Sequence, residues 1–404
     1  MKLLIAPLHY VADKYEGSEY TRAYDYLEYL SRQKDINGDV LVGYCSEKKM
    51  GNLKIISMFK RKPTYISNII RLQFVVWIFI KWLLLKLRNN YDVIWHNGPF
   101  SLNETFSLVA ILNKSTPFII GPIVTPHQYV SEDESRSMGK KIFKRNLLQI
   151  VLKKIDHLTY PLSKVFRYLS YLTLRKSKLV LVKETDCLKL INKYDFRNII
   201  VHNMGLNLKE FGFNHAKYIN ANVVNIITVS YLVKRKGVTD LVDIMNYLIK
   251  SRKRTNYRLK IVGSGPEFDN IKRKIKELNL SKYIKLVGFV TKKLIHKYYE
   301  NSDLFVTTTL SDSMPAMYFE AMASGLLVIS YDNPSVRELK LKGAKIVTSE
   351  VGNISNYAKC IMDNTKDSNK LMALGKANYK LSKEEFSFEK KMEMFTSYLE
   401  KLKK

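Results

Sequence analysis

Two acidic residues in the C-terminal half of the chain, Asp312 and Glu320, have the chemistry and the spacing to hold a ligand. They follow an apolar run at residues 303–307 that is typical of a buried strand, and Pro315 then favours the first turn of a helix. Eight residues correspond to about two helical turns, so both carboxylates can border one ligand while contacting different parts of it. The alternative for Glu320 is an acid on a solvated helix face.

The start of this helix is predicted to bind phosphate. Asp312 or Ser313 can serve as its N-cap, and Gly325 can serve as its C-cap. The backbone N–H groups at such an N-terminus, which here include those of Met314 and Ala316, favour phosphate or diphosphate. The alternative for Asp312 is a helix cap with no ligand.

A basic loop at residues 229–237 follows a predicted strand at residues 224–230. Lys234, Arg235 and Lys236 are consecutive in this loop. An ammonium group held near the ligand would neutralise the negative charge that develops on a leaving diphosphate. The alternative is a solvated basic loop in a chain that is basic throughout.

Other residues after predicted strands are candidates for ligand contacts. Gly263 lies in a Gly-Ser-Gly turn, where the missing side chain permits a close approach of the backbone. His96 and His127 come after the predicted strands at 92–95 and 117–120 and could orient a substrate hydroxyl. An isolated histidine is more often structural, so that alternative stays open for both.

The composition excludes several classes of protein. The chain has 404 residues, a formal net charge of +30 and 46% hydrophobic residues, so it can form two or three cored domains. Its cysteines, Cys45, Cys187 and Cys360, form no disulfide framework or zinc motif, which indicates a reducing compartment. The apolar run at residues 2–6 is shorter than that of a signal peptide, so we expect a cytoplasmic protein. No nucleic-acid-binding motif accompanies the charge, and we expect no nucleic acid partner.

The positive charge is clustered in two stretches of the first half. Residues 48–91 hold ten lysines or arginines and no acid, and residues 135–183 hold thirteen with Asp156 as their only acid. Large apolar residues alternate with these cations, as in helices that bind anionic lipid surfaces. The most apolar run, residues 72–87, is interrupted by Lys81 and is too short to span a bilayer. It is either a core helix whose charged side chains extend to solvent or a helix that lies on an anionic membrane.

Apolar, β-branched runs alternate with amphipathic segments along the whole chain, which predicts parallel sheets covered by helices. The fold class is therefore α/β, with two doubly wound Rossmann-like domains facing a central cleft, at residues 1–205 and 206–385. The predicted strands lie at residues 2–6, 39–43, 92–95, 117–120, 179–182 and 198–201 in the first half, and at 224–230, 258–262, 284–287, 303–307, 327–330 and 344–347 in the second.

Together these motifs resemble the family-4 glycosyltransferases, which have the GT-B fold. Their signature contains two acids separated by seven residues. Asp312 and Glu320 keep this spacing, although the first acid of the family is a glutamate. The loop at residues 229–237 resembles the family's diphosphate-binding loop, with Tyr231 in place of an expected arginine. Further signature residues are in register, namely Ser311, Pro315, Ala321, Met322, Ala323 and Gly325.

The resemblance implies a role for each matched residue of the second half. Asp312 would approach hydroxyl groups of the donor sugar, and Glu320 would bind the ribose. Lys236 would bind the diphosphate, with Arg235 or Lys234 compensating for the missing arginine.

Other donor contacts implied by the resemblance involve both halves of the chain. Gly17 and Ser18 match a loop that approaches the diphosphate from the first domain, although a turn capped by Ser18 is the alternative. Gly263 matches a strand-to-helix turn beside the donor. The backbone near Phe289 and Val290 would contact the base.

The resemblance implies a retaining glycosyltransferase that moves a hexose-type sugar from a nucleotide diphosphate sugar to a cell-surface glycan or a lipid-linked acceptor. Residues 1–205 would bind the acceptor and residues 206–385 the nucleotide sugar, and a C-terminal helix at residues 386–404 would cross back onto the first domain. We expect no metal cofactor, because the site offers lysine and a helix N-terminus rather than an Asp-x-Asp cluster. The basic apolar segments favour a peripheral position on the inner face of the cell membrane.

Two alternatives remain open. One is a nucleotide-sugar epimerase of the same fold, which would need no acceptor. The other is a donor-binding or membrane-scaffold protein with weakened catalysis, made conceivable by Asp312 and Tyr231, which depart from the family pattern.

Overall fold

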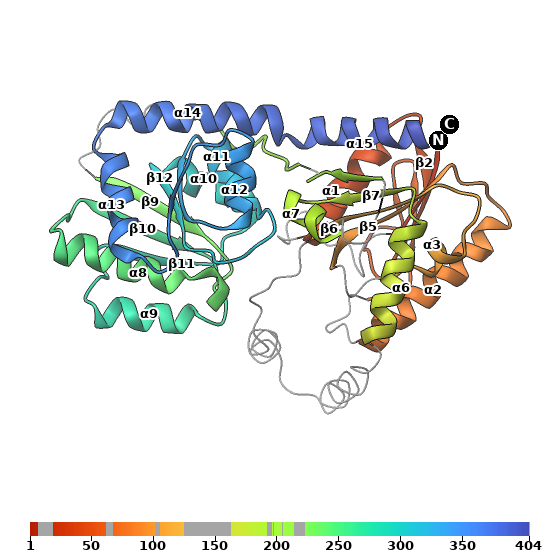
Figure 1. The fold of residues 1–404 in the computed structure, drawn as a ribbon, viewed down its shortest axis with the longest axis horizontal. Coiled ribbons are helices and arrows are strands. Elements are labelled where there is room, and N and C mark those ends of the chain that lie inside the picture. The colour runs from red at the N-terminus through yellow and green to blue at the C-terminus, as the bar shows by residue number, and fades with distance from the viewer. Residues whose placement is uncertain are drawn as a thin grey trace. The chain divides into compact units, whose positions relative to one another are not determined.

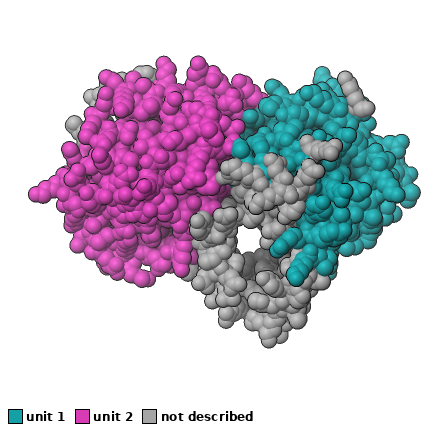
Figure 2. Space-filling view, in the orientation of Figure 1, with its two compact units in different colours: residues 1–126, 143–204, 391–404 teal, residues 127–142, 205–390 magenta. Residues whose placement is uncertain are grey.

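Two compact units make up the described part of the chain (Figures 1 and 2). The first unit contains the described residues of segments 1–126 and 143–204 together with 391–404, and the second contains residues 205–390. Each unit is built on its own largely parallel sheet, so the prediction of two Rossmann-like α/β domains is confirmed. The computed structural model describes residues 1–6, 19–61, 68–101, 106–124, 163–191, 196, 198–203, 205–213 and 223–403.

The first unit has an eight-stranded sheet with the order β3-β4-β2-β1-β5-β6-β7-β8. Neighbouring strands are parallel except for β3 and β4, which are antiparallel. The strands are β1 (Lys2–Ile5), β2 (Asn37–Val42), β3 (Lys49–Met50), β4 (Leu53–Ser57), β5 (Val93–Ser101), β6 (Phe118–Val124), β7 (Leu179–Val182) and β8 (Ile199–Val201). The helices are α1 (Glu19–Ser31), α2 (Asn68–Lys86), α3 (Leu108–Leu112), α6 (Ser163–Lys176) and α7 (Thr185–Ile191).

Successive residues of the central strands face opposite layers of the first unit, as the period of a strand requires. Leu4 and Ile94 pack with Phe74 of α2 in one hydrophobic core. The next residue of β5, Trp95, instead contacts Tyr26 of α1, with 6.3 Å between ring centroids. Helices therefore cover both faces of the sheet, as expected for a doubly wound domain.

One face of α2 packs as the core-helix alternative requires, because Phe74, Ile78 and Trp82 are buried against the sheet. Its opposite face remains exposed to solvent. Among the described residues, no helix is both long enough and apolar enough to cross a bilayer.

Each predicted strand overlaps an observed one, but two details of the first sheet were not predicted correctly. The hairpin β3–β4 lies in a stretch that was interpreted only as basic and apolar, and its turn is Gly51-Asn52, with φ of +51° at Gly51. The strand expected to end at Trp95 continues to Ser101, because Asn97 still pairs with Gly121 of β6. His96 therefore lies inside β5 and not in a loop after it.

The second unit has a six-stranded parallel sheet with the order β11-β10-β9-β12-β13-β14. Its chain starts in the middle strand β9, moves outward through β10 to β11, and then returns to β12 on the other side of β9. The strands are β9 (Val224–Val229), β10 (Tyr257–Val262), β11 (Ile284–Gly288), β12 (Leu304–Thr307), β13 (Leu327–Tyr331) and β14 (Ile346–Ser349). The helical segments are η4 (Lys234–Lys236), α8 (Val238–Asn246), η5 (Tyr247–Ser251), α9 (Phe268–Glu277), α10 (Lys292–Glu300), α11 (Ala316–Ala323), α12 (Pro334–Leu341), α13 (Ile354–Thr365), α14 (Ser368–Glu385) and α15 (Phe388–Lys403).

This strand order creates a topological switch point between β9 and β12. Successive connections leave the sheet in opposite directions there, and α/β proteins commonly bind ligands beside the carboxyl ends of the strands at such a point. The loop after β9 carries the predicted basic residues, and the loop after β12 carries Asp312.

The C-terminal helix α15 belongs to both units. It starts at Phe388 in the second unit, where Phe388 donates its backbone N–H to the carbonyl of Leu206 at 3.1 Å. From Lys391 onward it is part of the first unit. There the fully buried Phe395 lies against Trp95, with ring centroids 4.4 Å apart.

We expect the substitution Phe395→Ala to lower the free energy of unfolding of the first unit by about 3–5 kcal/mol, because it empties a buried aromatic site. Urea unfolding followed by tryptophan fluorescence measures this selectively, since Trp77, Trp82 and Trp95 are the tryptophans of the chain and all belong to that unit. Met394→Ala is the control, because Met394 is exposed on the same helix. Equal stability of the two variants would show that α15 does not stabilise the first unit.

The buried His202, which contacts Phe395 and Tyr398 of α15, predicts a loss of stability in acid. Burial, together with the charge of Lys391, lowers the pKa of His202 to about 4. Because an unfolded histidine has a pKa of about 6.5, unfolding takes up a proton between these values. The free energy of unfolding should therefore fall by roughly 3 kcal/mol as the pH decreases from about 6.5 to about 4. A His202→Phe variant should lose less over this range in the same fluorescence assay, and identical pH profiles would contradict the prediction.

Candidate functional site

The site is built by two loops at the switch point, which are joined by their backbones. The loop after β9 ends at Gly237, whose φ is +60°. A side-chain carbon at this position would lie 2.4 Å from the carbonyl oxygen of Thr308, so only glycine fits against the loop after β12. The N–H of Leu310 also donates to the carbonyl of Arg235 at 2.9 Å. The two predicted motifs, 76 residues apart in sequence, are thus held side by side.

Two cations of the first loop surround the carboxylate of the second. The ammonium group of Lys236 forms an ion pair with Oδ2 of Asp312. The guanidinium Nη1 of Arg235 lies 3.6 Å from the same oxygen and donates to the carbonyl of Ser311 at 3.0 Å. All three charged side chains are largely buried, with 6% of Lys236 exposed. Two cations beside one carboxylate leave an excess of positive charge, which suits a phosphate or diphosphate ligand.

Arg235 and Lys234 were the two cations expected to compensate for Tyr231, and they differ in position. Tyr231 is exposed, whereas Arg235 is mostly buried and points its guanidinium group at Asp312. Lys234, the other candidate, is exposed. Of these two cations, Arg235 is the one that the fold brings next to the predicted ligand-binding residues.

The turn before α11 differs from its predicted geometry. The helix begins at Ala316, and Pro315 is its N-cap, so neither Asp312 nor Ser313 caps it. Met314 has a left-handed backbone with φ of +45°, which interrupts the helical path before the proline. Its N–H is not directed at a ligand, because it donates to Oγ of Ser335 at 2.9 Å.

Ser335, at the start of α12, stabilises this turn from both sides. Besides accepting from Met314, its hydroxyl donates to the backbone carbonyl of Asp312 at 2.7 Å. The N–H of Ser313 donates to Oδ1 of Asp312 at 2.9 Å, which fixes the carboxylate further. The buried hydroxyl of Ser313 has no hydrogen-bond partner among the described residues, and such a group is expected beside a ligand site.

The second acid, Glu320, is oriented by a residue that sequence reasoning missed. Its Oε2 accepts a hydrogen bond of 3.0 Å from the phenol of Tyr299 on α10. Tyr299 is fully buried, and burial together with the nearby Glu320 carboxylate raises the pKa of Tyr299 well above its usual value. The phenol therefore stays protonated and donates to Glu320 throughout the physiological range. The one local signal is the spacing of Ile295 and Tyr299, which predicts that both lie on the buried face of a helix but not that Tyr299 contacts Glu320.

The glycine turn after β10 packs against the loop after β9. A side-chain carbon on Gly263 would lie 1.8 Å from the carbonyl oxygen of Ser230, and one on Gly265 would lie 2.4 Å from that of Leu232. The close approach permitted by these glycines is thus to the neighbouring loop. At the end of β11, Phe289 is 67% exposed, while Val290 packs against the hydrophobic core.

Of the remaining predicted residues, His96 belongs to the first unit and the others lie outside the described residues. His96 is buried within β5, where its ring meets the edge of Phe118 at 6.1 Å, which favours a structural role. Gly17, Ser18 and His127 lie outside the described residues. Among the described residues, no group of three or more acids, histidines and cysteines could hold a metal ion.

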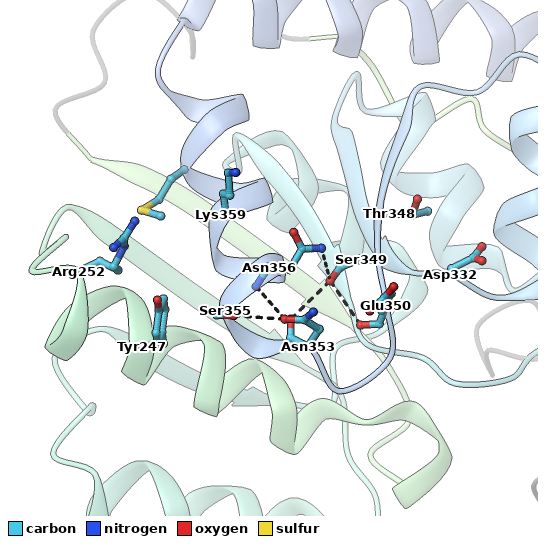
Figure 3. Close-up of a pocket in the computed structure, with 11 residues that line it drawn as sticks. Tyr247, Arg252, Asp332, Thr348, Ser349, Glu350, Asn353, Ser355, Asn356 and Lys359 are labelled. Atoms are coloured by element: carbon cyan, nitrogen blue, oxygen red, sulfur yellow. Dashed lines mark hydrogen bonds between the residues drawn. The ribbon is translucent and has the colours of Figure 1, made fainter.

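A separate polar cavity of about 650 Å³ opens near the ends of β13 and β14 (Figure 3). Its polar groups largely satisfy one another: Asn356 donates to Ser349 at 3.1 Å through its amide, and the Asn353 side chain caps α13. None of the predicted site residues lines it. Its contacts therefore stabilise the loop at the start of α13, and the charged cluster remains the better candidate site.

Comparisons with known proteins find that the chain is similar to glycosyltransferases. Residues 213–381 match the family model described as glycosyl transferases group 1. An uncharacterized glycosyltransferase of Haemophilus influenzae is 29% identical over 135 residues, which are 33% of this chain and 37% of that protein. An alpha-monoglucosyldiacylglycerol synthase of Acholeplasma laidlawii is 32% identical over 108 residues, 26% of this chain and 27% of that protein. The matched segments thus span about a third or less of these relatives.

Solved structures match over nearly the whole chain. A sucrose-phosphate synthase from Thermosynechococcus elongatus superimposes with a TM-score of 0.70 at 15% identity, covering 99% of this chain and 98% of that one. HepE from Anabaena, in complex with UDP, superimposes with a TM-score of 0.68 at 14% identity, covering 99% and 100%. At identities this low, the superpositions establish a shared fold only.

We expect Ser335→Ala to lower the free energy of unfolding of the second unit by about 1–3 kcal/mol, because the buried N–H of Met314 loses its acceptor. Differential scanning calorimetry of the full chain measures this change. Ser355→Ala is the control, since Ser355 is an exposed serine on α13 and its loss should change stability by less than about 0.5 kcal/mol. If both variants unfold like the parent protein, Ser335 does not hold the turn.

Proposed function

We propose that this chain, whose residues 213–381 match the family model of glycosyl transferases group 1 and whose two domains have the GT-B fold, is a retaining glycosyltransferase. It moves a hexose-type sugar from a nucleotide diphosphate sugar to an acceptor hydroxyl. The observation that carries this proposal is the cluster of Arg235, Lys236 and Asp312 at the switch point of the second domain.

In this proposal the two cations bind the diphosphate of the donor. Lys236 and Arg235 are held by contacts that do not require the ligand, so little reorganisation is needed when phosphate oxygens arrive. Lys236 would then lie between the carboxylate of Asp312 and a phosphate oxygen. The Ser313 hydroxyl and the N-terminus of α11, starting at Ala316, add donors on the same side.

The two acids bind different parts of the donor. Asp312, next to the cations, contacts hydroxyls of the sugar that is transferred. Glu320, held by Tyr299, uses its other oxygen to bind ribose hydroxyls. Backbone groups near Phe289 and Val290 contact the base, and the loop containing Gly263 borders the diphosphate. Since the related fold of HepE has been seen with UDP, a uridine nucleotide is the first donor to test.

Transfer with retention needs no separate base. The acceptor oxygen attacks the anomeric carbon from the face that the diphosphate leaves, as the bond between that carbon and the phosphate oxygen breaks. The acceptor proton passes to the departing diphosphate oxygen. Lys236 and Arg235 neutralise the charge that develops on the leaving group, so the products are the glycosylated acceptor and a nucleoside diphosphate. No metal cofactor is assigned a role in this scheme.

The acceptor is proposed to be a cell-surface glycan or a lipid-linked molecule. Two curated relatives are named alpha-monoglucosyldiacylglycerol synthase, and another is an amylovoran biosynthesis glycosyltransferase of Erwinia amylovora. Their names point to acceptors on a lipid or in an exopolysaccharide. An acceptor of this kind is compatible with a peripheral position on the inner face of the cell membrane.

We expect UDP or another nucleoside diphosphate to raise the melting temperature of the protein without added metal, and Lys236→Ala to weaken this binding at least about tenfold, because a buried cation at the diphosphate is lost. Calorimetric titration with UDP, GDP and ADP and their sugars gives the affinities. Lys234→Ala is the matched control, since Lys234 lies two residues away and is exposed.

Turnover separates the proposal from its alternatives. Glu320→Gln and Lys236→Ala should both reduce the release of nucleoside diphosphate from the nucleotide sugar when an extract containing the acceptor is added. An isomerised nucleotide sugar formed without acceptor would indicate an epimerase. Absence of binding to every nucleotide by a folded protein would contradict the proposed donor site and favour a scaffold.

A further inference from the structure

The outer face of α2 in the first unit carries a continuous row of exposed apolar side chains. At 100° per residue the row covers about 120° of the helix circumference, opposite the buried Phe74, Ile78 and Trp82. Surface helices normally present polar residues on this side, so a row of this kind marks an interaction surface. The α2 stripe consists of six residues that are 40–84% exposed: Leu72, Val76, Ile80, Leu83 and Leu84 on the helix, and Leu87 in the turn directly after it.

Cations border the α2 stripe on both edges. Lys86 lies on one edge, with its ammonium group 5.1 Å from the centre of the Trp82 ring, and Lys81 and Arg88 lie on the other. No acidic residue occurs anywhere between positions 48 and 91. An apolar strip with cations along both sides matches the layers of an anionic bilayer, where acyl chains lie just below phosphate groups.

The neighbouring helices α3 and α6 also lack acidic residues. Helix α3 packs against both α2 and α6, and the three lie on one side of the first unit (Figure 1). Helix α6 has Val165 and Tyr168 exposed, and its cations are Lys164, Arg167, Arg175 and Lys176. Helices α3 and α6 therefore add cations and no acid to this side of the unit.

This charge pattern disfavours a second copy of the chain as the partner. A twofold interface through the α2 stripe would bring Lys81, Lys86 and Arg88 of each copy toward the same cations of the other, with no acid in this segment to compensate them. An anionic surface has no such conflict. The helix also cannot turn to cross a membrane, because its inner face is fixed in the core of the unit.

We propose that the α2 stripe inserts into the interface of an anionic membrane, with α2 parallel to the bilayer plane and its flanking cations at the level of the lipid phosphates. The purpose of this docking rests on the proposed function, since an enzyme with a lipid-linked acceptor meets its substrate at such a surface. The docking itself requires no catalysis and is measured without a sugar donor.

The test is flotation of the full-length protein with vesicles of phosphatidylcholine alone or of phosphatidylcholine with one third phosphatidylglycerol. The parent protein should bind only the anionic vesicles, more weakly as salt is raised. The triple variant Ile80→Gln, Leu83→Gln, Leu84→Gln should lose binding at least about tenfold, because its apolar insertion is removed. Since these side chains are exposed, its tryptophan fluorescence and melting temperature should match those of the parent.

Two matched controls separate the stripe from general effects. Leu341→Gln removes an apolar side chain that is 83% exposed on α12 of the second unit, and it should leave vesicle binding unchanged. Lys81→Gln with Arg88→Gln should weaken binding several-fold at low salt. The charge-matched pair Lys272→Gln and Arg273→Gln, exposed on α9, should have much less effect.

Several outcomes would overturn the proposal. These are failure of the parent protein to bind anionic vesicles at low salt, unchanged binding by the folded triple variant, and equal losses in the two charge variants. A parent dimer that the triple variant converts to a monomer, without vesicle binding, would assign the stripe to self-association. UDP binding by the triple variant distinguishes these results from failure of the donor site: if it persists, only the docking proposal is lost.

Discussion

The ion pair between Lys236 and Asp312 is the interaction on which the rest of the candidate site depends. It joins the loops after β9 and β12, the two strands between which the sheet reverses its order. Because both side chains are largely shielded from water, leaving either charge without its partner would cost about 3–5 kcal/mol. The surrounding contacts help to keep the two charges together. Arg235 adds a second cation, the N–H of Ser313 binds the other carboxylate oxygen, and the backbone contact at Gly237 keeps the loops in place.

The surroundings of the two acids differ in a way that suits different tasks. Asp312 lies among cations and backbone donors, so its negative charge is already compensated and a phosphate can approach without meeting a bare carboxylate. Glu320 lies eight residues further along, on α11, and its contact at Oε2 is a neutral phenol. A phenol fixes the orientation of a carboxylate while leaving it fully charged. Glu320 can thus accept hydrogen bonds from hydroxyl groups, which need a strong acceptor but carry no charge of their own.

Sequence reasoning found the parts of the site that depend on short-range patterns. The strands, the Gly237 and Gly263 turns, and the association of Lys236 with Asp312 follow from periodicity, glycine placement and a known motif order. The contacts that complete the site are long-range and carry no local signal. Ser335 reaches the turn from the next helix along the chain, and Tyr299 reaches Glu320 from the preceding one.

Local signals also competed with one another. Because Met314 has a left-handed backbone, α11 begins only at Ala316. The sequence does not predict this break, since methionine has a high helix propensity. The short hairpin β3–β4 did have a local signal, the pair Gly51-Asn52, which favours a two-residue turn. The stretch around it was interpreted only as basic and apolar, so that signal was not used.

The cations behind the net charge of +30 act in two different ways. Lys236 is buried beside a carboxylate, so its interaction is short-range and salt screens it little. Lys81 and Arg88 lie at the surface with no acid in their segment, so they act on distant charges and are screened within about 10 Å at ordinary ionic strength. Raising the salt concentration should weaken attraction to an anionic surface while leaving the geometry of the candidate site unchanged. The two groups of cations can therefore be separated by their response to salt. Those at the switch point of the second unit lie beside a carboxylate, whereas those around the apolar helix of the first unit have no acid in their segment.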